Sequence, residues 1–192
     1  MAKVGLSKPY YAKYAANAGS VTYTGGAVMG KAVEATIEPD DSDTEYFYAD
    51  NGPAESAQQF AGGELTLEID RLLASVVGDL YGITPGSSST PVGSTVEFSG
   101  NIVVPYVGIG LISKNIVNND PVWMGVMLPK VQFELPTLEM TTQGEDIEFT
   151  GNELSATILR DDTADAKWLK LGWFSTEADA EAWIKGLLNI AT

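Results

Sequence analysis

The sequence has no cysteine and no histidine. These absences exclude disulfide bonds, thiolate catalysis, nucleophiles activated by histidine, and zinc sites built on histidine or cysteine. Basic residues are also scarce, with 11 Lys and Arg against 26 Asp and Glu and a net charge of −15. A monomer this anionic is not expected to bind nucleic acid, because such binding depends on cationic groups that displace counterions.

Long hydrophobic runs are absent as well. No stretch reaches the roughly 18 apolar residues that a membrane-spanning helix needs. Near the N-terminus, Tyr10, Tyr11 and Tyr14 interrupt any apolar stretch that could serve as a signal peptide. We therefore expect a protein that is made and used without Sec export.

What the chain does contain is enough apolar material for one domain. It has 192 residues, of which 44% are hydrophobic and 19% charged, so a single domain over residues 1–192 is expected. Charge is unevenly spread: residues 1–31 hold four lysines and no acid, whereas residues 32–70 hold eleven acids and no base. One interpretation of such a charge run is that it forms a solvated face. The alternative is a basic N-terminal arm, residues 1–20, that docks on the acidic surface of a neighbouring copy.

The dominant hydrophobic period is two, which predicts a mainly β fold. Within residues 31–38, Val33, Ala35 and Ile37 alternate with Glu34, Thr36 and Glu38, and residues 64–70 alternate in the same way. Such strands have one buried and one solvated face, as in antiparallel sheets. Turn signals at 40–43 and at Asn51-Gly52 predict a long hairpin over residues 39–60 with an acidic tip.

Two helices are expected among the strands. A short helix near 71–81 has an apolar stripe from Leu72 to Leu80, with Asp70 as its predicted cap and Gly82 at its end. A C-terminal helix near 176–189 begins at Thr176, and Asp179 completes a capping box.

No motif makes a persuasive active site. Gly25–Lys31 matches most of a phosphate-binding loop, but the hydroxyl that would hold Mg²⁺ is missing and a strand pattern follows instead of a helix. The segment 41–45 is similar to the start of a calcium loop, but Tyr46 replaces the required glycine. Gly108-Ile109-Gly110 is predicted to mark a bulge or a close backbone contact. We expect no catalytic residue, no metal site and no cofactor.

The order of several segments resembles the major tail protein of long-tailed bacteriophages, the subunit of the tail tube. No single segment is diagnostic, but the likeness extends over nearly the whole chain. The segments that carry it are Val4–Leu6, Pro9–Ala12, Val21–Gly26, Gly30–Val33, Phe47–Asn51, Phe60–Leu67, Leu128–Phe133, Thr141–Glu145 and Phe174–Ala180.

This resemblance implies a β-sandwich that contributes strands to an oligomeric β-barrel tube. Six copies would form a ring, and stacked rings would form a hollow tube through which viral DNA passes without specific binding. It also implies a tape-measure protein inside the tube during assembly, and tail-terminator, head-completion and tail-tip proteins at its ends. The expected protein is therefore a structural component of the virion and not an enzyme. The alternative is a carbohydrate-binding or adhesin-like β-module of a virion, suggested by Trp123, Trp168, Trp173 and Trp183.

Two sets of residues follow from this interpretation. By strand alternation, polar side chains of inner strands would line the tube: Glu34, Glu38, Glu64, Glu68, Gln132, Glu134 and Glu148. The acidic loop from Asp40 to Glu55 would contact lysines of a stacked copy. The residues predicted for that contact are Lys3, Lys8, Lys13, Asp40, Asp41 and Asp43.

Overall fold

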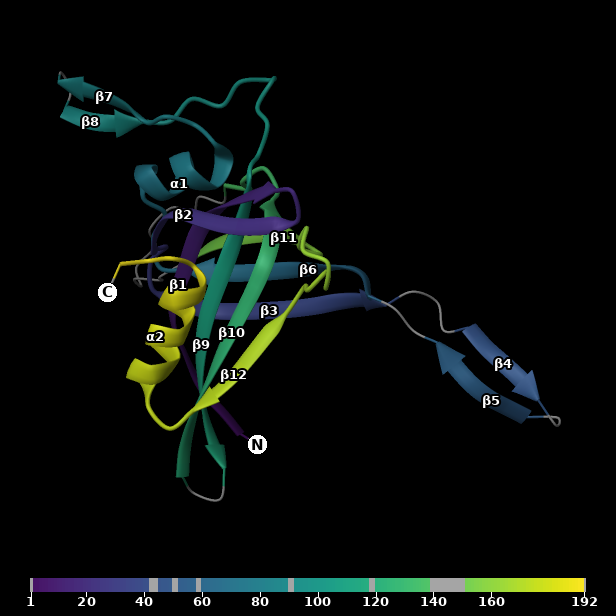
Figure 1. The fold of residues 1–192 in the computed structure, drawn as a ribbon. Helices are drawn as coiled ribbons and strands as arrows, with labels where there is room; N and C mark the ends of the chain where they lie inside the picture. Colours follow the sequence, from purple (N-terminus) through teal and green to yellow (C-terminus); the bar gives the residue numbers. More distant parts are fainter. Residues whose placement is uncertain are drawn as a thin grey trace, which may run out of the picture.

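A computed structural model describes residues 2–41, 45–49, 52–57, 60–89, 92–117, 120–138 and 151–191 of the chain. It confirms the predicted mainly β, sandwich-like fold, with a large antiparallel sheet and two helices (Figure 1). The strands are β1 Ala2–Asn17, β2 Ser20–Val28, β3 Ala32–Asp41, β4 Glu45–Ala49, β5 Gly52–Ala57, β6 Phe60–Ile69, β7 Gly86–Ser89, β8 Val92–Thr95, β9 Tyr106–Val117, β10 Asp120–Phe133, β11 Asn152–Leu159 and β12 Lys170–Phe174. The helices are α1 Ala74–Tyr81 and α2 Glu177–Leu187.

The main sheet has the order β2-β1-β9-β10-β11-β6-β3, and β12 also pairs with β10. The long strand β10 changes partner along its length: Trp123–Met127 pair with β12, and Lys130–Phe133 pair with β11. At this point, between Leu128 and Val131, the register between β10 and β9 shifts. Figure 1 shows the result, with β3 and β6 crossing β9 and β10 steeply.

The main core lies between these two crossing parts of the sheet. Strands β6 and β11 contribute Leu65, Leu67 and Ile158, and β9 contributes Val107 and Ile109, all fully buried. Helix α1 closes one end of this core with Val76, Leu80 and Tyr81, and Gly82 ends the helix in the left-handed conformation at φ 69°. The short helix predicted near 71–81 is confirmed, and it begins at Ala74.

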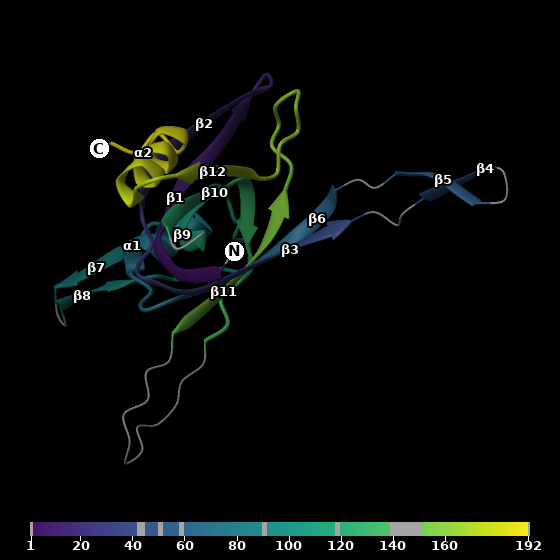
Figure 2. The same ribbon diagram turned by 90° about the horizontal axis from the view of Figure 1, so that it is seen from below.

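A second core lies on the opposite face of β1, β9 and β10, under α2 (Figure 2). Ala180, Ile184 and Leu188 of the helix are fully buried there. Gly108 and Gly110 allow this close approach, because a Cβ on either would come within 3.0 Å of Tyr23, Ile184 or Leu188. The predicted close backbone contact at Gly108–Gly110 is confirmed. Thr176 caps the helix as predicted, accepting from the Asp179 backbone N–H at 3.2 Å.

Two sequence expectations are wrong. Residues 2–20 do not form an arm separate from the domain: β1 pairs with β2 on one side and β9 on the other, and Tyr10 and Tyr11 are buried on opposite faces of the strand. Asp70 does not cap α1, because the N-cap position of this helix is Leu73, three residues further along the chain. The Asp70 carboxylate instead accepts from the Lys31 backbone N–H at 2.7 Å, and Leu73 is an N-cap without a side-chain bond.

Two hairpins extend beyond the main sheet (Figures 1 and 2). Strands β3 and β6 pair as far as Asp41 and Phe60, and β4 and β5 pair with each other beyond that point. The hairpin expected over 39–60 therefore corresponds to the ends of β3 and β6 together with β4 and β5. The shorter hairpin β7–β8 follows α1. None of the helices in the described residues is long and apolar enough to cross a membrane.

Candidate functional site: an acidic sheet face

One face of the sheet formed by β3, β6, β11 and the end of β10 is strongly acidic; we call it the acidic face. Register places Glu34 opposite Glu68, and Glu68 opposite Glu153, in one row across three strands. A second row contains Thr36, Thr66 and Ser155, and a third contains Glu38, Glu64, Thr157 and Gln132. Glu134 lies at the edge of the second row, where its backbone N–H donates to the Ser155 carbonyl at 2.9 Å.

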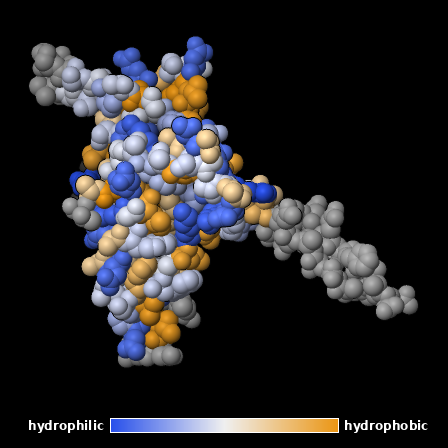
Figure 3. All heavy atoms as spheres, in the orientation of Figure 1, coloured by the Kyte–Doolittle hydropathy of each residue, from blue (hydrophilic) through white to orange (hydrophobic). Residues whose placement is uncertain are grey.

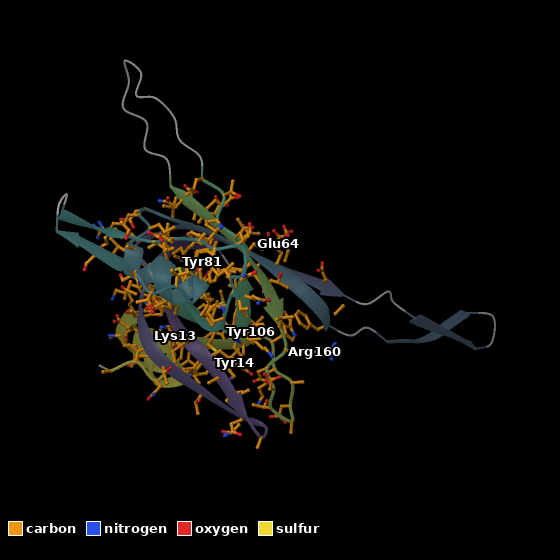
Figure 4. The ribbon with its side chains drawn as sticks, turned by 90° about the horizontal axis from the view of Figure 1, so that it is seen from above. Lys13, Tyr14, Glu64, Tyr81, Tyr106 and Arg160 are labelled. Carbon is orange, nitrogen blue, oxygen red and sulfur yellow. The ribbon has the colours of Figure 1, made fainter. Side chains whose placement is uncertain are left out.

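The opposite face of the same strands supplies the main core. Leu65, Leu67 and Ile69 alternate with the acids of β6 and are fully buried. Glu34, Glu38, Glu64 and Glu134 are exposed, while Glu68 and Gln132 are half-buried. In Figure 4, Glu64 lies beside β6 and β11, away from Tyr14 and Tyr106. The structure thus brings the predicted polar residues of β3, β6 and β10 onto one solvated face, as strand alternation indicated.

This arrangement is unfavourable for the isolated subunit. Directly opposed residues of antiparallel strands have Cβ atoms about 5 Å apart, and like charges at that distance destabilise the sheet. Two unit charges at such a separation repel by about 1 kcal/mol in water. Glu68 has a like charge on each side, Glu34 and Glu153, and Glu38 faces Glu64. These pairs therefore do not stabilise the folded chain.

The acidic face also lacks neutralising partners within the described residues. The ion pairs of the described residues involve acids elsewhere in the chain, and none includes a glutamate of the acidic face. The nearest lysine along β10, Lys130, binds Asp162 at 2.8 Å and lies over the Tyr106 and Tyr14 rings. The guanidinium of Arg160 donates to the Phe60 carbonyl. Among the described residues, no ion pair therefore offsets the repulsion on this face.

The residues predicted to line the tube differ in part from those that the structure places on the acidic face. Gln132 is turned toward its own chain, where its Nε2 donates to the Val104 carbonyl at 2.9 Å. Glu148 lies outside the described residues. Glu153 was missed by the sequence analysis, although Asn152–Leu159 alternates as clearly as β6. Its place beside Glu68 depends on the register of β11, which a single sequence does not determine.

Among the residues predicted for contact between stacked copies, those that the structure describes do not lie together on one surface. Lys13 binds Asp79 of α1 at 2.6 Å, and Lys8 pairs with Glu181 and Glu177 of α2. Both lysines therefore already hold helices of their own chain onto β1. Asp40 is exposed near the end of β3. The side chains of Lys3 and Asp41 and the whole of Asp43 lie outside what the structure describes.

Other motifs considered in the sequence do not form sites. The glycine-rich segment 25–31 ends β2 and leads directly into strand β3, without the helix that phosphate binding needs. Within the described residues no group of three or more acids is placed to hold a metal ion. The four tryptophans do not gather at one place: Trp168 stacks on Phe60, Trp173 is 55% exposed, and Trp123 of β10 and Trp183 of α2 pack against the second core.

Comparison with known proteins gives no assignment. No protein-family model matches the chain, and no curated protein is significantly similar to it.

Proposed function

We propose that the chain is a structural subunit of a phage tail tube, in which six copies form a ring and rings stack into a hollow tube. The observation that carries this proposal is the acidic face, whose opposed glutamates destabilise the monomer and have no cationic partner among the described residues. A lumen that conducts DNA needs a surface that repels phosphates. Such repulsion acts over a Debye length of about 8 Å at physiological salt.

The ends of the sheet support assembly. In the described strands, β3 and β2 are the two ends of the strand order. An open edge exposes unpaired backbone groups, and pairing with a neighbouring copy removes that liability. A hollow of about 310 Å³ lies beside the β3 edge, and Val33 in its wall is 55% exposed. The rest of its apolar lining comes from Leu6, Ala35, Ile37, Leu111, Met124 and Val126. A second copy covering β3 would bury this surface.

In this proposal the β4–β5 hairpin and Asp40 contact the next ring, with Asp41 and Asp43 as further acids of that loop. Lys8 and Lys13 are not needed for the contact, because they bind acids of their own helices. The tape-measure, terminator, head-completion and tip proteins are the remaining partners, and the location is the virion after assembly in the host cytoplasm. The tryptophans give little support to the alternative of a carbohydrate-binding module, because Trp168 packs against the main core whereas Trp123 and Trp183 pack against the second core.

Electron microscopy of the concentrated, purified chain tests the proposal directly. We expect rings or tubes with a central channel, and a change in their abundance with salt. A matched pair of variants locates the contact: Val33→Asp at the β3 edge should prevent assembly, whereas Val103→Asp, at an 85% exposed site away from that edge, should not. Monodisperse globules at every protein and salt concentration would refute a tube subunit.

A further inference from the structure

A second hollow, of about 550 Å³, lies away from the acidic face; we call it the polar pocket. Its walls are the β1–β2 turn, the segment after β11, the start of β12 and the end of α2. The volume lies in the range of small-molecule sites, about 300–1,000 Å³. The side chains used in the argument are Thr22, Asp161, Thr163, Lys170 and Asn189.

Asp161 gives the polar pocket a fixed carboxylate. Its side chain is only 7% exposed, and a single oxygen, Oδ1, accepts from the Thr163 backbone N–H, the Thr163 hydroxyl and the Lys167 backbone N–H at 3.3, 2.7 and 2.9 Å. The Asp161 N–H also donates to the Lys167 carbonyl at 2.8 Å, which closes the loop. No hydrogen bond from the described residues reaches Oδ2. A carboxylate has about four acceptor positions, so Oδ2 can accept from a ligand.

The remaining polar groups of the pocket are similarly oriented by the chain. The Thr163 hydroxyl donates to Asp161 and the Thr22 hydroxyl donates to the Ala15 carbonyl at 3.4 Å, so both oxygens are left as acceptors. Asn189 uses its Nδ2 to donate to the Tyr23 carbonyl at 3.2 Å, which leaves its amide oxygen as an acceptor. Lys170 is the cationic donor of the lining. Val21 and Leu187 supply apolar wall.

This combination selects the chemistry of the ligand. A small anion would meet the buried Asp161 carboxylate, and a lone cation would meet Lys170. A neutral polyol satisfies both, since each hydroxyl can donate to a carboxylate or amide oxygen and accept from an ammonium. The mixed apolar and polar walls suit a sugar ring, which has apolar C–H surfaces and a polar rim.

We propose that the polar pocket binds a neutral, monosaccharide-sized polyol through Asp161 Oδ2, Lys170 and the Asn189 amide oxygen. This site is independent of the tail-tube proposal, and it uses none of the four tryptophans that suggested a sugar groove from the sequence.

Saturation-transfer NMR on the whole chain tests the proposal, because it reports ligand signals whether the chain is monomeric or assembled. The probes are D-glucose, D-galactose and N-acetyl-D-glucosamine, compared with acetate, tetramethylammonium and glycine. We expect transfer to at least one sugar, and competition among sugars that bind. No transfer to any sugar would overturn the proposal, as would stronger transfer to the anion, the cation or the zwitterion.

Two variants locate the binding. Asp161→Asn keeps an oxygen for the three internal donors but replaces the free acceptor with an N–H₂ donor, and should weaken sugar binding about tenfold, the loss typical of a charge-assisted hydrogen bond. Lys170→Gln should weaken it less. The matched control is Lys31→Gln, which removes an exposed lysine between β2 and β3 that does not line the polar pocket. Thermal melts check folding. Binding unchanged in folded Asp161→Asn and Lys170→Gln would place the sugar elsewhere and refute this site.

Discussion

At the residue scale, one carboxylate connects the C-terminal helix with the first strand. Glu181 of α2 accepts from the Tyr10 hydroxyl at 2.7 Å, pairs with Lys185 at 2.8 Å, and also pairs with Lys8. Ser7 donates to the neighbouring Glu177 at 3.1 Å. Bonds from Lys185, Lys8 and Tyr10, in that order, lower the pKa of Glu181 to about 2, and the same contact contributes, after burial, to raising the pKa of Tyr10.

The depressed pKa makes this contact sensitive to acid. A carboxyl whose pKa falls on folding stabilises the protein fully above its unfolded pKa, here 4.5, and that stability is lost as the pH falls toward 2. Glu181→Gln should therefore lower the free energy of unfolding by about 1 kcal/mol at pH 7, since the bonds are charge-assisted but partly solvated. The difference from the parent should shrink between pH 4.5 and pH 2. Urea unfolding across this range measures it.

A suitable control for this prediction is Asp120→Asn, which removes an exposed acid with no ion pair among the described residues. Its effect should be near zero at every pH. A stability difference for Glu181→Gln that stays constant from neutral to acidic pH would contradict the assigned role of the carboxylate.

At the element scale, strand faces were predictable from the sequence but strand neighbours were not. Period-two alternation in β3 and β6 identifies which side chains face the solvent, because one face must supply the core. Nothing local indicates that β11 lies beside β6, so Glu153 was missed. The N-terminal strand was mistaken for an arm because it is rich in small residues and lysines. Its burial depends on Tyr10 and Tyr11 packing into cores that distant segments complete.

Because glutamates of the acidic face lie opposite one another, we expect that neutralising one of them stabilises the fold. Glu68→Gln removes repulsion from both Glu34 and Glu153, and should raise the free energy of unfolding by about 0.5–1 kcal/mol. For a chain of this length that corresponds to about 1–4 °C in melting temperature. The gain should be larger at low salt, where screening is weaker. The reference variant is Glu97→Gln, an exposed acid in the segment between β8 and β9. An equal or smaller gain for Glu68→Gln than for this reference would show that the rows do not repel.

At the scale of the whole molecule, polar and apolar surfaces are separated by layer. The acidic face lies outside the β3–β6–β11 layer, the main core lies beneath it, and α2 covers the far side of β1, β9 and β10. On the face viewed in Figure 3, hydrophilic and hydrophobic side chains are interspersed over the body of the molecule. The acidic face gathers glutamates from β3, β6 and β11 on one surface, and the composition alone, at a net charge of −15, could not place them.

The proposed tube makes a prediction about DNA that depends on this placement. Tubes of the parent chain should not retain short duplex DNA, because the lumen would repel phosphates. Tubes of Glu38→Lys/Glu64→Lys should retain it at low salt and release it as salt rises, since binding through lysines depends on counterion release. The control Glu97→Lys/Asp120→Lys has the same net charge but leaves the acidic face intact, and should retain less DNA. Co-sedimentation of labelled DNA with tubes over a salt series measures all three. Equal retention by the two lysine variants would show that net charge, and not the acidic face, governs passage of DNA.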